Sequence, residues 1–310
     1  MASRFLKYSV LLQKYRTPLL VACCGGVFAA NMSYHVFPDI SYRKLYQAWH
    51  KGEPADLSEK LEDLFKQVLK DYGLSSPKNF SPFASFGFHP VGAGVPWLPA
   101  GAQIGIPANF NSTADDPSGI TNRTIFINGK AVDWSSDAGS ALKEALVFSI
   151  EAQKFAIARE MARLQSGGPV LSAVVAPFCL SGVWVYSVVL KQVLGLHTGP
   201  PLLRGAVNVV ALGLGAVSYF LTSDAVSQWI DLNSDRLAAR VSRDYANGGV
   251  EFYDKILSRN KTLRSLMGQK GEDMYAPSGN LFPSNILQLK HTPYTSRRDG
   301  ILTLLKEEKV

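Results

Sequence analysis

Cysteine is scarce in this sequence, and the three cysteines lack the spacing of a thiol site. Cys23 and Cys24 are neighbours, Cys179 lies far from both, and each falls within an apolar stretch. A disulfide framework or a thiolate metal site needs several cysteines at set spacings, such as CxxC. The sequence therefore excludes a disulfide-stapled fold, a thiol-based copper chaperone and a dithiol redox carrier.

Charged residues are also few, at 18% of the 310 residues, whereas a soluble domain has about a quarter. The net charge of +7 includes no basic patch interleaved with aromatic residues, so we expect no nucleic-acid partner. Apolar residues reach 46% and are concentrated in a few stretches. This imbalance predicts membrane segments, with the lipid bilayer as a partner, in an otherwise ordinary chain.

Two stretches contain no charged residue, residues 168–190 and residues 205–223. About 20 apolar residues in a helix cross the ~30 Å hydrocarbon core of a bilayer, so each stretch is long enough. The link between them, residues 191–204, is short and contains two adjacent prolines. We therefore predict a transmembrane helical hairpin. The alternative is a pair of buried helices in a large soluble core.

A third apolar stretch, residues 17–37, follows a basic, acid-free segment at residues 1–16. This order fits a signal peptide or a retained anchor. The stretch is long for a signal-peptide core, and no small-x-small cleavage site closes it. We therefore expect a membrane anchor.

The basic residues indicate how the three spans are oriented. Lys191 and Arg204 lie in the hairpin link, and a basic segment precedes the anchor. Because basic residues gather on one side of a membrane, both regions are expected on that side. The extramembrane regions, residues 38–167 and 224–310, then share the opposite side. We expect them to pack together.

The extramembrane regions show mainly helical periodicity. We predict helices over residues 57–72, 138–165, 224–245 and 250–267. Strands are expected at residues 103–107 and 124–128, with a hairpin turn at Asn128-Gly129. A turn is expected at Asn247-Gly248-Gly249, and a loop over residues 277–298. The predicted fold is a mainly α membrane protein with a small β-containing extramembrane region.

Short segments resemble motifs of membrane zinc metallopeptidases of the HtpX and CaaX-protease type. The segment AREMAR, residues 158–163, stands where that family has HExxH, and Asp231 and Asp235 stand where it has an acidic ExxxD pair. His291 and the following Pro293 resemble its later histidine–proline segment. The resemblance implies an inactive, metallopeptidase-like α+β scaffold interrupted by the transmembrane hairpin.

Arginine replaces both zinc-binding histidines of that motif, at Arg159 and Arg163. A guanidinium stays protonated and offers no lone pair to a metal. We therefore predict no catalytic residue, no metal and no cofactor, although Glu160 keeps the position of the general base. Instead, we expect the arginines to pair with Glu160, Asp231 and Asp235 in a structural charge cluster. The alternative is that AREMAR is a solvated helix face and that the aspartates mark an ordinary helix start.

Longer strings occur along the whole chain. They include SYHVFPD (33–39), LPAGAQIGIPA (98–108), EAQKFAIARE (151–160) and KHTPYTSRRD (290–299). These strings resemble the transmembrane protein 177 family of the mitochondrial inner membrane. The resemblance implies a multi-pass inner-membrane protein and pseudoenzyme that acts in cytochrome c oxidase assembly.

In that role the protein stabilises newly made cytochrome c oxidase subunit II and its membrane chaperone, with copper-insertion factors in the same assembly. We expect Gly182, Gly213 and Gly215 to let the hairpin approach the helices of the subunit. The alternative is a membrane metallopeptidase-like hydrolase with a non-standard metal site at Asp231 and Asp235. A pore is disfavoured because the spans contain no charge.

Overall fold

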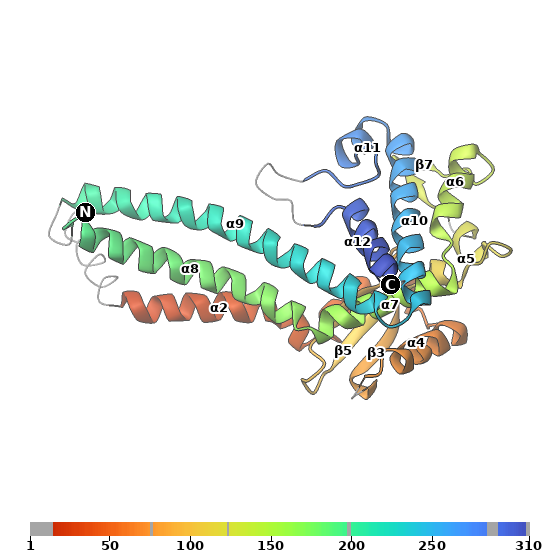
Figure 1. Ribbon diagram of the computed structural model, residues 1–310, viewed down its shortest axis with the longest axis horizontal. Coiled ribbons are helices and arrows are strands. Elements are labelled where there is room, and N and C mark those ends of the chain that lie inside the picture. The colour runs from red at the N-terminus through yellow and green to blue at the C-terminus, as the bar shows by residue number, and fades with distance from the viewer. Residues whose placement is uncertain (1–14, 75–76, 123, 197–199, 284–290, 308–310) are drawn as a thin grey trace. The chain divides into compact units, whose positions relative to one another are not determined.

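The computed structural model describes residues 15–74, 77–122, 124–196, 200–283 and 291–307. The chain divides into two compact units, which we describe separately (Figure 1). The membrane unit comprises residues 1–33 and 170–226, and the α+β unit comprises residues 34–169 and 227–310.

Three long apolar helices contribute to the membrane unit. They are α2 (Arg16–Val36), α8 (Gly168–Val193) and α9 (Pro201–Ala239). Each is long and apolar enough to cross a membrane, as predicted. Their outer faces expose large apolar side chains, among them Phe178 and Val209. Such faces need lipid around them, so these helices do not fit the alternative of a soluble core.

The α8 and α9 helices approach closely at Gly215. A Cβ atom at this position would lie 2.0 Å from the side chain of Val183. Gly182 and Gly213, in contrast, have nothing within 4 Å of an added Cβ atom. Gly215 therefore lets α8 and α9 pack against each other, whereas we expected it to contact the helices of another protein. The space beside Gly182 and Gly213 is free for such a contact.

The α9 helix is longer than expected. We predicted a span ending at residue 223 and a separate helix over 224–245, but one helix runs from Pro201 to Ala239. No proline or glycine stands near the predicted junction, so nothing in the backbone interrupts the helix.

The α+β unit contains a three-stranded sheet. Its strands are β3 (Phe80–Ser85), β4 (Val91–Gly94) and β5 (Ala102–Pro107), in the order β3-β5-β4. The central strand β5 pairs in parallel with β3 and antiparallel with β4. It is buried along its whole length, as a strand covered on both faces should be. The strand predicted at residues 103–107 is therefore confirmed.

Two short hairpins accompany the sheet. They are β1 (Trp49–His50) with β2 (Glu53–Pro54), and β6 (Phe126–Ile127) with β7 (Lys130–Ala131). Asn128 and Gly129, between β6 and β7, have φ angles of 53° and 74°. These values are typical of a two-residue hairpin turn, so the predicted turn is confirmed, although β6 is shorter than the strand expected at 124–128.

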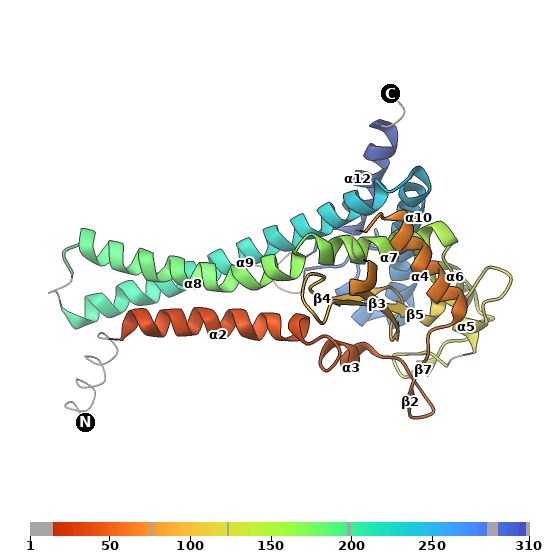
Figure 2. The same ribbon diagram turned by 90° about the horizontal axis from the view of Figure 1, so that it is seen from below.

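The α+β unit also contains several helices. Besides the end of α9, they are α3 (Tyr42–Tyr46), α4 (Glu59–Asp71), α5 (Ser118–Thr121), α6 (Asp137–Leu146), α7 (Ile150–Gln165), α10 (Arg243–Met267), α11 (Gln269–Met274) and α12 (Tyr294–Glu307). Short 3₁₀ turns occur at Pro77–Asn79 and Ala108–Asn111. The α7 helix lies against β4 and β5 and also packs against α4 and α10 (Figure 2). It is the central helix of the hydrophobic core.

The amphipathic helix predicted at 57–72 is confirmed as α4. Ser58 caps its start by accepting a hydrogen bond from the backbone N–H of Leu61. Leu61, Phe65 and Val68 are buried on one face of the helix, which is the apolar stripe that the periodicity indicated.

The single helix predicted over 138–165 is wrong, because α6 ends at Leu146 and α7 begins at Ile150. Val147 has an extended backbone, and Ser149 caps α7 by accepting a hydrogen bond from Ala152 N–H. The Ser149 hydroxyl also donates to the Glu251 carboxylate at 2.6 Å. A tertiary hydrogen bond from α10 thus fixes a break that helix propensity alone did not show.

The turn predicted at Asn247-Gly248-Gly249 is also wrong, because α10 runs through these residues. A Cβ atom at Gly248 would lie 2.3 Å from the backbone of Glu151, and one at Gly249 would lie 2.7 Å from the ring of Phe155. The glycines therefore let α10 and α7 come close together. The loop predicted over 277–298 is wrong at its end as well, since α12 begins at Tyr294 just after Pro293, a position that proline tolerates.

We predict that Gly248→Ala destabilises the protein by about 1–3 kcal/mol, because the added methyl group collides with the Glu151 backbone. The measurement is thermal unfolding of the purified full chain in detergent. The control is Gly300→Ala in α12, where an added Cβ atom meets nothing within 4 Å. This control should leave the stability unchanged or raise it by up to ~1 kcal/mol through helix propensity. Equal unfolding temperatures for both variants would contradict the close approach of the two helices.

Candidate functional site: an arginine–carboxylate cluster

The cluster begins on α7, which carries three of the five predicted residues. Arg159 and Arg163 lie one turn apart, so their side chains leave the same face of the helix. Glu160 lies beside them and is buried, with the side chain 6% exposed. The Arg159 Nη1 atom donates to Glu160 Oε1 at 2.9 Å, and Arg163 Nε donates to Glu160 Oε2 at 2.9 Å.

The end of α9 supplies the two aspartates. Asp231 and Asp235 also lie one turn apart and are both buried. Arg159 donates from Nη2 to Asp231 Oδ1 at 3.0 Å and from Nε to Asp235 Oδ1 at 3.1 Å. The structure therefore brings all five predicted residues together, and the guanidinium of Arg159 touches all three carboxylates.

Arg163 also contacts the backbone of strand β4 at Gly92. Its Nη2 atom donates to the backbone carbonyl of Gly92 in β4. A Cβ atom at Gly92 would lie 3.1 Å from Leu164 and 3.4 Å from Glu160. A larger residue there would push β4 away from α7, so the absent side chain helps Arg163 reach the strand.

Arg297 on α12 belongs to the same cluster, although it was absent from the predicted set. Its Nε donates to Asp235 Oδ2 at 2.6 Å and its Nη2 donates to Asp235 Oδ1 at 2.8 Å, while Nη1 lies 3.3 Å from Asp231 Oδ1. The guanidinium lies 5.0 Å from the ring centroid of Tyr253. The string KHTPYTSRRD contained Arg297, but it did not show which of its two arginines points inward.

Tyr253 on α10 is the second residue that was missed. Its hydroxyl donates to Asp235 Oδ1 at 2.6 Å, and its side chain is buried. Burial raises the pKa of this phenol well above its ordinary value, and the negative charge of Asp235 contributes to the rise. Tyr253 therefore stays protonated and donates to Asp235 at neutral pH.

The charges of the cluster balance. Three guanidinium groups, from Arg159, Arg163 and Arg297, face three carboxylates, from Glu160, Asp231 and Asp235. Burial disfavours the charged form of Arg297, as does the nearby Arg159, but interactions with Asp235 and Tyr253 together raise its pKa above the ordinary value. Each of the six groups has a partner of opposite charge, which is the condition under which buried charges are tolerated.

The residues present do not fit a zinc ion. Within the described part of the chain, no group of three or more histidine, cysteine, aspartate or glutamate side chains is placed to hold a metal. Oxygen atoms of Glu160, Asp231 and Asp235 accept hydrogen bonds from arginines. A bound cation would have to displace these guanidinium groups and would be repelled by them. The arrangement can hold elements together, and it lacks the ligands for metal-assisted hydrolysis.

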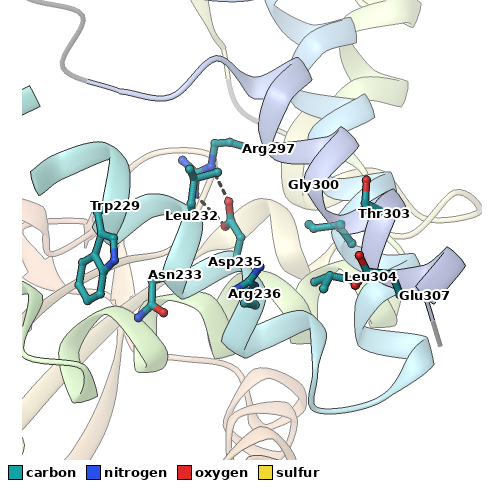
Figure 3. A pocket seen from close by; sticks show the side chains of 11 residues that line it. Trp229, Leu232, Asn233, Asp235, Arg236, Arg297, Gly300, Thr303, Leu304 and Glu307 are labelled. Carbon is teal, nitrogen blue, oxygen red and sulfur yellow. Dashed lines mark hydrogen bonds and ion pairs between the residues drawn. The ribbon is translucent and has the colours of Figure 1, made fainter. Parts of the chain in front are cut away.

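Cavities lie on two sides of the cluster. One of about 310 Å³ is lined by Glu160, Arg163 and His291, among others. His291 Nδ1 lies 3.2 Å from Asp231 Oδ2, and its side chain is 56% exposed. The other cavity, of about 440 Å³, lies between α9 and α12, with the Asp235–Arg297 pair among its lining residues (Figure 3). Trp229 and Leu232 lie at this cavity and are exposed.

Comparison with known proteins decides the family. The profile of the family described as "Transmembrane protein 177" matches residues 100–291. Relatives of that name are 69% identical in Danio rerio, 55% in Xenopus laevis and 46% in Homo sapiens. These matches cover 100%, 97% and 98% of this chain, and 100%, 96% and 97% of the relatives.

The chain belongs to the transmembrane protein 177 family. No solved structure matches it. The family profile and the relatives that match are those of transmembrane protein 177, so the metallopeptidase-like scaffold is not supported. This chain instead has a neutral, fully paired charge cluster that joins α7, α9, α10 and α12.

We predict that Arg297→Met destabilises the protein by about 3–5 kcal/mol, because it leaves the buried carboxylate of Asp235 with one cation fewer. The matched control is Arg298→Met on the next position of α12. Arg298 pairs with Asp254 and Asp299 at the surface, where such pairs contribute about 0–1 kcal/mol. Unfolding of both variants, with protein abundance in cells, is the measurement. An equal loss of stability in the two variants would show that the buried cluster stabilises the protein no more than the ion pairs at the surface do.

Proposed function

We propose that this protein is a non-enzymatic assembly factor of the mitochondrial inner membrane that acts in the biogenesis of cytochrome c oxidase subunit II. Its partners are the newly made subunit, the membrane chaperone of that subunit, and copper-insertion factors in the same assembly. The observation that carries the proposal is the match to the transmembrane protein 177 family along the whole chain. The basic, acid-free segment at residues 1–16 supports mitochondrial import.

The chemistry of the cluster supports a role without catalysis. In an HExxH site the glutamate acts as general base on a water molecule that the metal holds, and here arginines replace both metal-binding histidines. Both carboxylate oxygens of Glu160 accept hydrogen bonds from arginines, one from Arg159 and one from Arg163. With Glu160 held in this way, binding is the activity that remains for the α+β unit.

The open glycines of the hairpin support contact with a client in the membrane. Helices associate in lipid through small residues that let their backbones approach. Gly182 on α8 and Gly213 on α9 are exposed and have nothing within 4 Å of an added Cβ atom. We infer that these two positions receive the membrane helices of subunit II.

We predict that affinity purification of the tagged full chain from mitochondria recovers newly made subunit II together with its chaperone. Removal of the protein should shorten the lifetime of newly made subunit II, because its membrane helices lose a packing partner. Pulse labelling of mitochondrial translation products measures both effects, and another mitochondrially encoded subunit is the internal control. Recovery of neither partner, with an unchanged lifetime, refutes the proposal.

Glycine variants test the contact itself. Gly182→Leu with Gly213→Leu should lower the recovery of subunit II while the protein stays as abundant as the original, since an added Cβ atom at either position meets nothing within 4 Å. Gly25→Leu with Gly26→Leu on α2 is the matched control, because it adds the same bulk at two other positions with nothing within 4 Å of an added Cβ atom. Loss of subunit II in the control alone would place the client on α2 instead.

The hydrolase alternative leads to a separate prediction about metal content. We expect the purified protein to hold no stoichiometric zinc, because the arginines repel a cation from the carboxylates. Elemental analysis of the full chain measures this. Zinc that is retained at one ion per chain and lost on Asp231→Asn would overturn the proposed function in favour of a hydrolase.

A further inference from the structure

Three basic side chains meet at one end of the membrane unit, and nothing described above uses them. Arg16 opens α2, Lys191 lies in the last turn of α8, and Arg204 lies near the start of α9. The beginning of α2, the end of α8 and the beginning of α9 share one end of this unit (Figures 1 and 2). Lys191 lies close enough to Arg16 and Arg204 for electrostatic repulsion between its ammonium group and both guanidinium groups.

Two of these cations are held by neighbouring side chains. The guanidinium carbon of Arg16 lies 6.0 Å from the ring centroid of Trp184 on α8, over the face of the indole. Lys191 Nζ donates to Asn208 Oδ1 on α9, and the hydroxyl of Ser187 donates to the same oxygen at 2.8 Å. These contacts link all three helices at the level of the cations. The side chains are therefore positioned together, although like charges repel one another.

The membrane unit offers these cations no carboxylate. Its sequence, residues 1–33 and 170–226, contains a single acidic residue, Asp224. Asp224 follows Arg204 by 20 residues on the same helix, a distance of about 30 Å at 1.5 Å per residue. No ion pair between described residues involves Arg16, Lys191 or Arg204. Their charges are therefore available to an anion from outside the chain.

Apolar side chains beside the cations indicate what kind of anion this is. Val189 precedes Lys191, and Val209 and Val210 follow Arg204, so all three lie on the side of the cations that faces the middle of the spans. All three are at least half exposed, with Val209 at 70%. A free ion gains nothing from such neighbours, whereas a phospholipid brings an acyl chain next to its phosphate.

We propose that Arg16, Lys191 and Arg204 form a binding site for the phosphate of an anionic phospholipid headgroup. The three cations contact the phosphate, and the exposed valines contact the acyl chains. The site lies wholly within the membrane unit, and it does not depend on the proposed role in assembly.

The test uses the purified full chain in neutral detergent, titrated with phosphatidylglycerol, with phosphatidylcholine or with inorganic phosphate. Native mass spectrometry counts the retained lipid, and thermal unfolding measures the stabilisation that a ligand of the folded state gives. We expect phosphatidylglycerol to bind and stabilise more than phosphatidylcholine, with an affinity that falls as salt rises. Equal effects of the two lipids overturn the proposal. An equal effect of inorganic phosphate overturns the assignment to a lipid.

Charge-removing variants locate the site. Lys191→Gln with Arg204→Gln should weaken phosphatidylglycerol binding about 25-fold, since each cation near the membrane surface contributes about 1 kcal/mol, or about fivefold. The control Lys130→Gln with Lys306→Gln removes the same charge from exposed positions of the α+β unit and should leave the affinity unchanged. Equal weakening in both double variants would show a general charge effect and refute the site.

Single substitutions at Arg204 keep the test valid if the double variant folds poorly. No described residue makes a hydrogen bond or ion pair with the Arg204 side chain in the structure, so Arg204→Gln should fold normally and bind about fivefold more weakly. Arg204→Lys keeps the charge and should retain most of the affinity. Unchanged binding by Arg204→Gln would contradict the proposal.

Discussion

Buried charge is the constraint around which the α+β unit is arranged. Three guanidinium groups and three carboxylates come from α7, α9 and α12, and Tyr253 joins them from α10. A single buried ion left without a partner costs several kcal/mol, whereas the complete set is neutral and hydrogen-bonded. The cluster therefore tolerates little displacement of any contributing helix. The close approach of α7 and α10 at Gly248 and Gly249 sets the spacing that such a cluster needs.

The buried charge cluster also limits the chemistry that is open to the α+β unit. The position where a metallopeptidase would need imidazoles is filled by arginines whose partners are their own neighbours. The α+β unit thus gains a rigid centre and loses the lone pairs that metal-assisted chemistry requires. Surfaces remain for binding, namely the cavity between α9 and α12, the open glycines of the hairpin, and the basic end of the membrane unit. These are the surfaces that the proposed role in assembly would use.

The sequence was a good guide where one local signal decides the structure. Uncharged runs predicted the candidate spans, the capped apolar stripe predicted α4, and Asn128-Gly129 predicted a hairpin turn. It was a poor guide where a distant element decides. Glu251 determines the break before α7, and the backbone of Glu151 explains why Gly248 lies inside a helix. For the cluster, motif positions pointed to five residues. Arg297 and Tyr253 could be assigned only from the fold, because only packing distinguishes the buried Arg297 from the partly exposed Arg298 beside it.

The place of Arg297 in the chain has a consequence for biosynthesis. A ribosome makes Arg159, Glu160 and Arg163 first, the two aspartates about seventy residues later, and Arg297 close to the C-terminus. Until α12 is complete, two cations face three carboxylates, and the nascent protein cannot bury this excess negative charge without penalty. The buried centre of the α+β unit is therefore neutral only once α12 has been made and has packed against α9.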